Sequence, residues 1–283
     1  MDKKILIIVV FIILLLMSGC SVNVGGDKIN FTGNIALDKG TTLTEELNTA
    51  RNAAEVERLD ISNNAGDITV KRSSADDISI KAVKKVKGTN EDIKKEIMQN
   101  IDIIVDNDGN KLSVYPSTKD GKKDDLWKWV DRLYKGAQVT IDLELEVPDN
   151  VKVYNVSNNA GKISFEEIAG ELDLEQNAGN ISLKDVSLTG SNNIKNNAGN
   201  INISADINKA EKLSINSTAS NIKLELPEKA AFELEIKLNA GNISGDFLPG
   251  THVNSGTFKQ QINGGGTKVI VTTVAGNVII NNK

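Results

Sequence analysis

The chain has 283 residues, a formal net charge of −5 at pH 7 and an aromatic content of 4%. This mildly acidic balance argues against a nucleic-acid-binding protein, because such proteins concentrate basic side chains in a patch. Cys20 is the only cysteine, so an intramolecular disulfide is excluded and stability has to come from a hydrophobic core.

The first residues predict a lipoprotein signal peptide at 1–19. Lys3 and Lys4 precede the apolar run Ile5–Met17, which is shorter than the about 20 residues of a membrane-spanning helix and fits the apolar region of a signal peptide. The run leads into Leu16-Met17-Ser18-Gly19-Cys20, which resembles a bacterial lipobox with Met17 in place of the usual leucine. This resemblance implies a diacylglyceryl group and an amide-linked acyl chain such as palmitate on Cys20.

A lipidated Cys20 would anchor the mature protein to the cell membrane on its extracytoplasmic face, because two acyl chains suffice for stable anchoring. The composition, rich in Ile, Asn and Lys, favours a Gram-positive-type envelope. Residues 20–56 are expected to hold the lipidated cysteine, a tether and an N-terminal cap. A strand or short helix is expected at Thr41–Ala54.

A tripeptide Asn-Ala-Gly, followed one residue later by Ile, recurs along the chain. The copies are Asn64-Ala65-Gly66, Asn159-Ala160-Gly161, Asn177-Ala178-Gly179, Asn197-Ala198-Gly199 and Asn239-Ala240-Gly241, with degenerate copies at Thr218-Ala219-Ser220 and Val274-Ala275-Gly276. From Ala160 to Ala240 successive alanines are 18, 20, 21 and 21 residues apart. Self-similarity at a nearly fixed period indicates a repeat architecture.

Apolar and polar residues alternate on both sides of each tripeptide. Leu172 and Leu174 precede one copy, and Ile181 and Leu183 follow it, which is typical of strands with one buried face. A two-strand unit of about 20 residues cannot bury its apolar face alone, so the units have to stack. We therefore predict an all-β protein, a right-handed β-solenoid (β-helix) of about seven coils at 57–283. Stacked asparagines are expected to hydrogen-bond along the turns.

Two rival folds fit less well. A left-handed β-helix needs a strict six-residue apolar period, and a calcium-binding β-roll needs Gly-Gly-x-Gly-x-Asp nonapeptides. The 20- and 21-residue steps break the first pattern, and the second motif does not occur in the sequence.

An insertion at 88–137 is expected to interrupt the solenoid near its N-terminal end as helix, hairpin and helix. Thr89 is predicted to cap the first helix, and Ile101–Val105 and Lys111–Tyr115 to form the hairpin. Its turn, Asp106–Asn110, has Gly109 at position 4 and not at position 6, so it does not fit an EF-hand loop and is read as a plain turn. The second helix is predicted at Asp125–Lys135.

The second helix carries both tryptophans. Its apolar stripe is expected to consist of Leu126, Val130 and Leu133. Trp127, Trp129 and Tyr134 allow two interpretations: the helix caps strand edges of the solenoid, or these side chains contact a partner or the membrane interface.

The chain resembles a widespread bacterial family of secreted and lipid-anchored β-strand-repeat proteins, which are catalogued as adhesins by inference from their architecture. The resemblance rests on the segments Leu59–Ile68, Lys85-Val86-Lys87 with the helix and hairpin after it, Leu145–Val151, Gly264–Lys268 and Thr272–Val278. It runs from about residue 57 to the C-terminus. It implies a strand-repeat fold and provides no catalytic residues.

The sequence contains no constellation typical of an enzyme, a cofactor or a metal site. The adjacent carboxylates of Asp76-Asp77, Asp124-Asp125 and Glu166-Glu167 point to opposite faces of a strand. Glu171, Asp173 and Glu175 are acidic, but the next coil offers Asn193 and Lys195 at these positions. His252 has no other histidine with which to bind a metal and is expected in a loop.

These observations predict a non-catalytic, membrane-anchored extracytoplasmic lipoprotein that presents a solenoid for binding or structural purposes. The expected partners are the membrane, through Cys20, and an envelope protein or a cell-wall glycan. A regulatory, stress-sensing envelope component is the alternative function. A glycan-active enzyme is the third, because β-helices also host such sites.

Overall fold

The computed structural model describes residues 21–24, 27–30, 36–37, 42–88, 90–120, 126–250 and 254–283. The strands are β1 (Ser21–Val24), β2 (Asp27–Asn30), β3 (Ala36–Leu37), β4 (Thr42–Asn52), β5 (Arg58–Ala65), β6 (Ile68–Arg72), β7 (Asp77–Lys87), β8 (Ile101–Asp108), β9 (Lys111–Thr118), β10 (Gln138–Val147), β11 (Val153–Ala160), β12 (Ile163–Glu166), β13 (Ala169–Ala178), β14 (Ile181–Ala198), β15 (Ile201–Ala219), β16 (Ile222–Leu226), β17 (Phe232–Ala240), β18 (Ile243–Ser244), β19 (Gly256–Ile262), β20 (Thr267–Ala275) and β21 (Val278–Asn282). The helices are α2 (Glu91–Asn100) and α3 (Leu126–Leu133). The predicted strand at Thr41–Ala54 is therefore β4.

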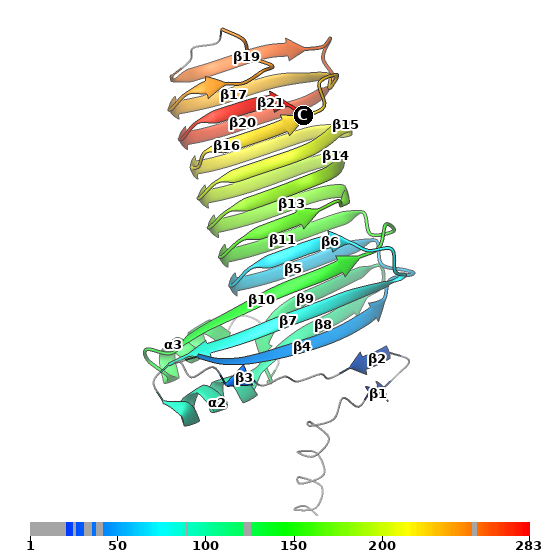
Figure 1. Ribbon diagram of the computed structural model, residues 1–283, viewed down its shortest axis with the longest axis vertical. Coiled ribbons are helices and arrows are strands. Elements are labelled where there is room, and N and C mark those ends of the chain that lie inside the picture. The colour runs from blue at the N-terminus through cyan, green and yellow to red at the C-terminus, as the bar shows by residue number, and fades with distance from the viewer. Residues whose placement is uncertain are drawn as a thin grey trace, which may run out of the picture.

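Each Asn-Ala-Gly copy forms a corner between two strands, and the strands stack into two walls (Figure 1). Wall A contains the strands that lead into the corners: β5, β11, β13, the second half of β14, the second half of β15, β20 and β17, extended by β9 at one end and β19 at the other. Wall B contains the strands that leave them: β6, β12, the first halves of β14 and β15, β16, β21 and β18, extended by β10, β7 and β4. The predicted all-β, solenoid-like stack is confirmed.

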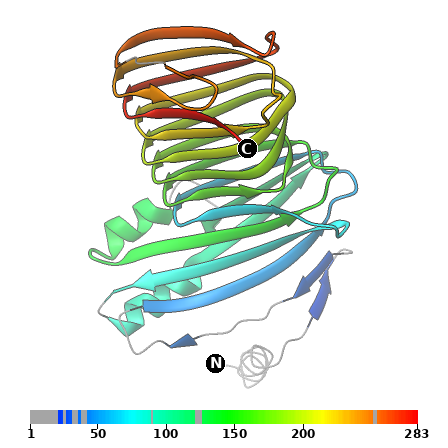
Figure 2. The same ribbon diagram turned by 45° about the horizontal axis from the view of Figure 1, so that its top comes forward.

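The two walls face each other across one continuous apolar core (Figure 2). Leu172 and Leu174 of wall A and Ile181 and Leu183 of wall B all lie within it, each at most 2% exposed. Successive side chains of these strands therefore point alternately into the core and toward solvent, as expected for strands with one buried face. The burial of this column of aliphatic side chains is the main source of stability, because each unit lacks a core of its own.

The corners stack in register. The alanines pair in the order Ala65, Ala160, Ala178, Ala198, Ala219, Ala275 and Ala240. Backbone hydrogen bonds tie the corners together: Gly66 N donates to Ala160 O at 2.9 Å, and Gly179 N donates to Ala198 O at 2.9 Å. This alignment of the corners confirms the central prediction from the repeat.

Two ladders of amide side chains reinforce the corners. On the outside, Asn197 Nδ2 donates to Asn177 Oδ1 and Asn177 Nδ2 donates to Asn159 Oδ1, both at 2.8 Å, which confirms the predicted asparagine ladder. On the inside, Asn158 Nδ2 donates to the carbonyl oxygen of Gly66 at 2.8 Å, and Asn196 Nδ2 donates to that of Gly179 at 3.0 Å. The inner amides are almost fully buried, so these bonds satisfy donors that would otherwise be costly to bury.

The order of corners in space departs from their order in the sequence at the C-terminal end. Ala275 pairs with Ala219 on one side and with Ala240 on the other. The last copy in the sequence therefore lies between the two copies that precede it.

Residues 88–137 contain α2, β8, β9 and α3 in that order. β8 pairs antiparallel with β9, and β9 pairs parallel with β5, so part of this segment extends wall A. Both helices lie near the end of wall B where Thr42, Lys87 and Gln138 are register partners (Figure 1).

The start of the first helix differs from the prediction by one residue. Asn90, and not Thr89, is the N-cap of α2, and its side chain accepts hydrogen bonds from the backbone N–H groups of Asp92 and Ile93. Both residue types are good caps, so the sequence alone did not separate them. The second helix, predicted from Asp125 to Lys135, is shorter in the structure and spans Leu126–Leu133.

Replacing Gly179 by valine is expected to lower the free energy of unfolding by more than about 3 kcal/mol. Gly179 has a φ of 137°, and an added Cβ would lie 1.7 Å from the carbonyl oxygen of Gly161. Urea denaturation followed by circular dichroism measures the loss. Gly109→Ala is the matched control, because Gly109 also has a positive φ but a Cβ there meets nothing within 4 Å, so a loss of only about 1 kcal/mol is expected. Equal losses for both variants would contradict the close approach at the corner.

Candidate binding groove

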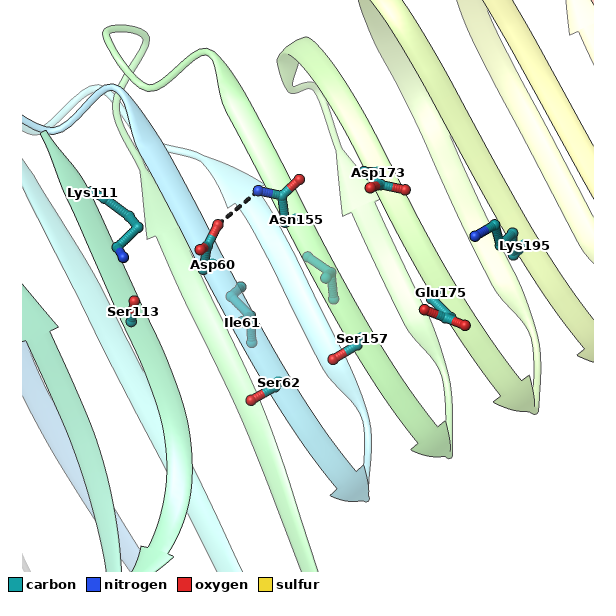
Figure 3. A pocket seen from close by; sticks show the side chains of 11 residues that line it. Asp60, Ile61, Ser62, Lys111, Ser113, Asn155, Ser157, Asp173, Glu175 and Lys195 are labelled. Atoms are coloured by element: carbon teal, nitrogen blue, oxygen red, sulfur yellow. Dashed lines mark hydrogen bonds between the residues drawn. The ribbon is translucent and has the colours of Figure 1, made fainter. Parts of the chain in front are cut away.

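A polar groove of about 370 Å³ lies on the outer side of wall A. Its lining comes from β9, β5, β11, β13 and β14 (Figure 3). The side chains that line it are Asp60, Ile61, Ser62, Lys111, Ser113, Asn155, Val156, Ser157, Asp173, Glu175 and Lys195. Most are hydroxyl, amide, carboxylate or ammonium groups, so the groove offers both hydrogen-bond donors and acceptors.

Apart from the buried Ile61 and Val156, the groove residues occupy the outward positions of the strand alternation. In β5, Asp60 and Ser62 alternate with the buried Leu59 and Ile61. The parallel register then aligns equivalent positions of neighbouring strands, and Asp60, Asn155 and Asp173 become successive partners. Strands in a sheet are about 4.8 Å apart, so these three side chains form a regular row across the wall.

A second row runs beside the first. It consists of Ser62, Ser157, Glu175 and Lys195, which are successive register partners. Glu175 therefore lies beside an ammonium group, and two hydroxyl groups continue the row toward β5 (Figure 3). The groove is thus a two-row array in which negative and positive charges are mixed.

Hydrogen bonds hold the first row in place. Asp60 Oδ1 accepts from Arg58 Nε at 2.8 Å and from Asn155 Nδ2 at 2.7 Å, and Asp173 Oδ1 accepts from Asn193 Nδ2 at 2.8 Å. Partial burial of Asp60 disfavours its charged form, but the hydrogen bonds from Arg58 and Asn155 outweigh this effect and lower its pKa. Asp60 is therefore an anion at neutral pH.

Asp60 does not suit the role of a general acid. A general acid needs a carboxyl group whose pKa is raised toward neutrality, whereas the pKa of Asp60 is lowered. Among the residues that the structure describes, no group of three or more His, Cys, Asp or Glu side chains is arranged to hold a metal ion. The groove can offer hydrogen bonds to hydroxyl, amide or ammonium groups of a ligand.

Sequence reasoning missed the groove, although a signal was present. Asp60, Asn155, Asp173 and Asn193 each stand five residues before their corner alanine. Aligning the copies on that alanine would have placed these four side chains in one row. The contribution of Lys111 and Ser113 from β9 could not be found in this way, because no corner follows β9 to set its register.

A second polar groove, of about 640 Å³, lies near the other end of wall A. Glu235 is one of its lining residues and accepts hydrogen bonds from Lys237 at 3.0 Å and Lys259 at 3.2 Å. These two bonds lower the pKa of Glu235.

The two tryptophans of α3 and Tyr134, which directly follows this helix, pack against the protein. Trp127 Nε1 donates to Val139 O at 3.3 Å, and the rings of Trp129 and Tyr134 form an edge-to-face pair with centroids 5.1 Å apart. A hydrogen bond to Glu96 of α2 raises the pKa of Tyr134 to about 12. All three aromatic side chains are partly buried against the core. This packing favours the cap interpretation, while a partner or membrane contact stays a prediction.

One member of the predicted apolar stripe of this helix is misplaced. Leu126 and Val130 are buried, but Leu133 is 54% exposed. Leu133 is the last residue of the helix.

Several sequence-predicted positions lie outside the described residues. They are the lipid attachment site Cys20, the N-cap candidate Thr89, the helix start Asp125 and the lone histidine His252. Within the part of the chain that the structure describes, no helix has the length and apolar character needed to cross a membrane.

A family model described as Toastrack DUF4097 matches residues 32–281. No curated protein matches the chain.

Several solved structures are similar to the chain at low identity. A protein from Clostridium sporogenes, provisionally assigned to cell adhesion, is 13% identical, with 85% of this chain and 100% of that chain covered and a TM-score of 0.42. A provisionally assigned adhesin from Bacteroides fragilis is 12% identical, with 83% and 96% covered and a TM-score of 0.33. Another from Parabacteroides merdae is 9% identical, with 84% and 96% covered and a TM-score of 0.32. At these TM-scores the likenesses carry no argument about function.

Proposed function

The chain belongs to the Toastrack family, and from that premise we propose that it is a non-catalytic, lipid-anchored protein that binds a polar envelope polymer. In this proposal the solenoid stands on the extracytoplasmic face of the membrane, and the groove on wall A is the binding surface. Cell-wall glycan is the ligand class that we favour, and an envelope protein is the alternative partner. The role is adhesive in the sense that it ties the membrane anchor to a polymer.

The groove carries this proposal. Its two rows place carboxylate, amide and hydroxyl groups at the strand spacing, so a ligand with many hydroxyl groups can make hydrogen bonds to several strands at once. Asp60 and Asp173 are already held by Arg58, Asn155 and Asn193, which reduces the entropy lost when a ligand binds. Charged acceptors of this kind make the stronger hydrogen bonds of a polar site.

The lipid anchor is the second part of the proposal and rests on the sequence before Cys20. Replacing Cys20 by serine removes the thiol that would be acylated, and the variant is expected in the soluble fraction of the culture. The unaltered protein is expected in the membrane fraction, because diacylated proteins stay bound to a bilayer. Immunoblotting of the two fractions measures this. A Cys20→Ser protein that stays in the membrane fraction would contradict lipid anchoring through this residue.

Replacing Asp173 by alanine is expected to weaken binding of solubilised cell-wall glycan roughly tenfold, since a hydrogen bond to a charged group contributes about 1.5–3 kcal/mol. Isothermal titration calorimetry on the purified protein measures the change. Asn216→Ala is the matched control, because Asn216 is an outward residue of wall A in the same row as Glu175 and Lys195 but does not line the groove.

Equal affinity for the unaltered protein and the Asp173→Ala variant would contradict the assignment of the groove. Binding of glycan by neither protein would favour an envelope protein as the partner. Release of new reducing ends from any member of a glycan panel would contradict a non-catalytic role.

A further inference from the structure

The two strands at the C-terminal end of the sequence fill an internal level of the solenoid. β20 pairs with β15 on one side and with β17 on the other. On wall B, β21 pairs with β16 and with β18. Figure 1 shows β20 and β21 between β16 and β17. We call β20, its corner and β21 the terminal rung.

The connection between β16 and β17 skips one level of the stack, and the terminal rung occupies that level. β16 ends at Leu226, and Pro227 cannot continue the ladder because it lacks a backbone N–H. The crossing segment that follows is held by Ala230 N, which donates to Pro227 O at 2.8 Å. β17 then starts two levels from β15 and leaves a space that is one rung wide. The remaining strand of this region, β19, pairs antiparallel with β17.

The return from β19 to the terminal rung is a short hinge, Asn263–Gly266. All four of its residues have positive φ, and Asn263 Nδ2 donates to the carbonyl oxygens of Glu228 and Ala230 at 3.0 and 2.9 Å. Through this hinge β19 and β20 lie on opposite sides of β17. On wall A, β17 therefore lies between β19 and the terminal rung.

The terminal rung is part of the core. Val269, Val271, Val278 and Ile280 are fully buried. Thr267 Oγ1 lies 2.8 Å from the carbonyl oxygens of both Ile207 and Ala210. Without this rung, the solenoid would have a slot with two open ladders on wall A and two on wall B.

We propose that the terminal rung is exchangeable and that the rung of one copy fills the slot of a second copy. A single segment, the hinge, joins the rung to the other strands that the structure describes. Exchange of an identical element about such a hinge is a low-cost route to dimers. Insertion of a strand from another chain is also an established mode of association through sheet edges.

The close backbone contacts at the corner limit which segment can fill the slot. Gly276 of the rung has a φ of 134°, and an added Cβ would lie 1.9 Å from the carbonyl oxygen of Ser220. A Cβ at Gly241, on the other side of the slot, would lie 1.9 Å from the carbonyl oxygen of Gly276. A general extended peptide lacks this glycine corner with apolar strands of the right length on both sides. The occupant that fits is therefore the same rung of a second copy.

The test uses two full-length variants in a Cys20→Ser background, which removes the native thiol. One carries Asn216→Cys on β15 and the other Thr272→Cys on β20. These positions are register partners on the outer side of wall A. The two variants carry different affinity tags, are refolded together from denaturant at high concentration, and are treated with a short thiol-to-thiol crosslinker. We expect a crosslinked heterodimer that both tags capture.

The matched control is the pair Ser157→Cys and Glu175→Cys, which are register partners on β11 and β13 inside the stack. These strands are not part of the terminal rung, so rung exchange leaves Ser157→Cys of one copy far from Glu175→Cys of the other, and no crosslinked heterodimer is expected. A crosslinked heterodimer from the first pair alone supports rung exchange. No crosslinked heterodimer from either pair, or equal amounts from both pairs, would overturn it.

Discussion

The structure depends on the close contact between backbones at the Asn-Ala-Gly corners. Each corner glycine brings its peptide group against the next corner, so that the space for a side chain is taken by a carbonyl oxygen, as at Gly179 and Gly161. The glycine N–H and the alanine carbonyl oxygen then bond from level to level. This contact sets one register for the strands that enter and leave the corners. The core and the outer surface follow from that register, because a shift by one residue would turn each side chain to the other face.

The same register produces the proposed binding surface. A residue at a given distance from its corner lies in one row with its counterparts on neighbouring strands. Asp60 therefore lies beside Asn155, which comes 95 residues later in the sequence, and Asp173 follows in the same row. Rows of outward side chains at the strand spacing suit repetitive polar ligands better than a compact substrate. The proposed exchange of the terminal rung uses the same corner, since its glycine determines which segment fits the slot.

Much of this architecture could be predicted from the sequence, because two local signals agree. The alternation around Leu172, Leu174, Ile181 and Leu183 indicates strands with one buried face, and the spacing of the corners indicates that these strands stack. The family resemblance that was drawn from the sequence is confirmed by the match to the Toastrack family. The choice of Thr89 as helix cap was wrong by one residue, because neighbouring Asn90 is also a favoured cap residue.

The parts that could not be predicted depend on which segments become neighbours. Ala240 precedes Ala275 in the sequence, and both carry the same corner signal, so no local property indicates that Ala275 pairs with Ala219. The pairing of β9 with β5 is a similar case, because no corner follows β9. A prediction of the groove would require two facts: that its residues stand at the same distance from their corner alanines, and that β9 pairs with β5. Only the first of these can be read from the sequence.

The most direct test of the stacked corners is pulsed electron paramagnetic resonance between spin labels at the corners, in a Cys20→Ser background. One label is placed at Asn64 and the other at Thr218, Val274 or Asn239 in turn. With about 4.8 Å per level, the account predicts distances between the corners of about 19, 24 and 29 Å, in that order. A longer distance to Val274 than to Asn239, or distances that do not increase by about one strand spacing, would contradict it.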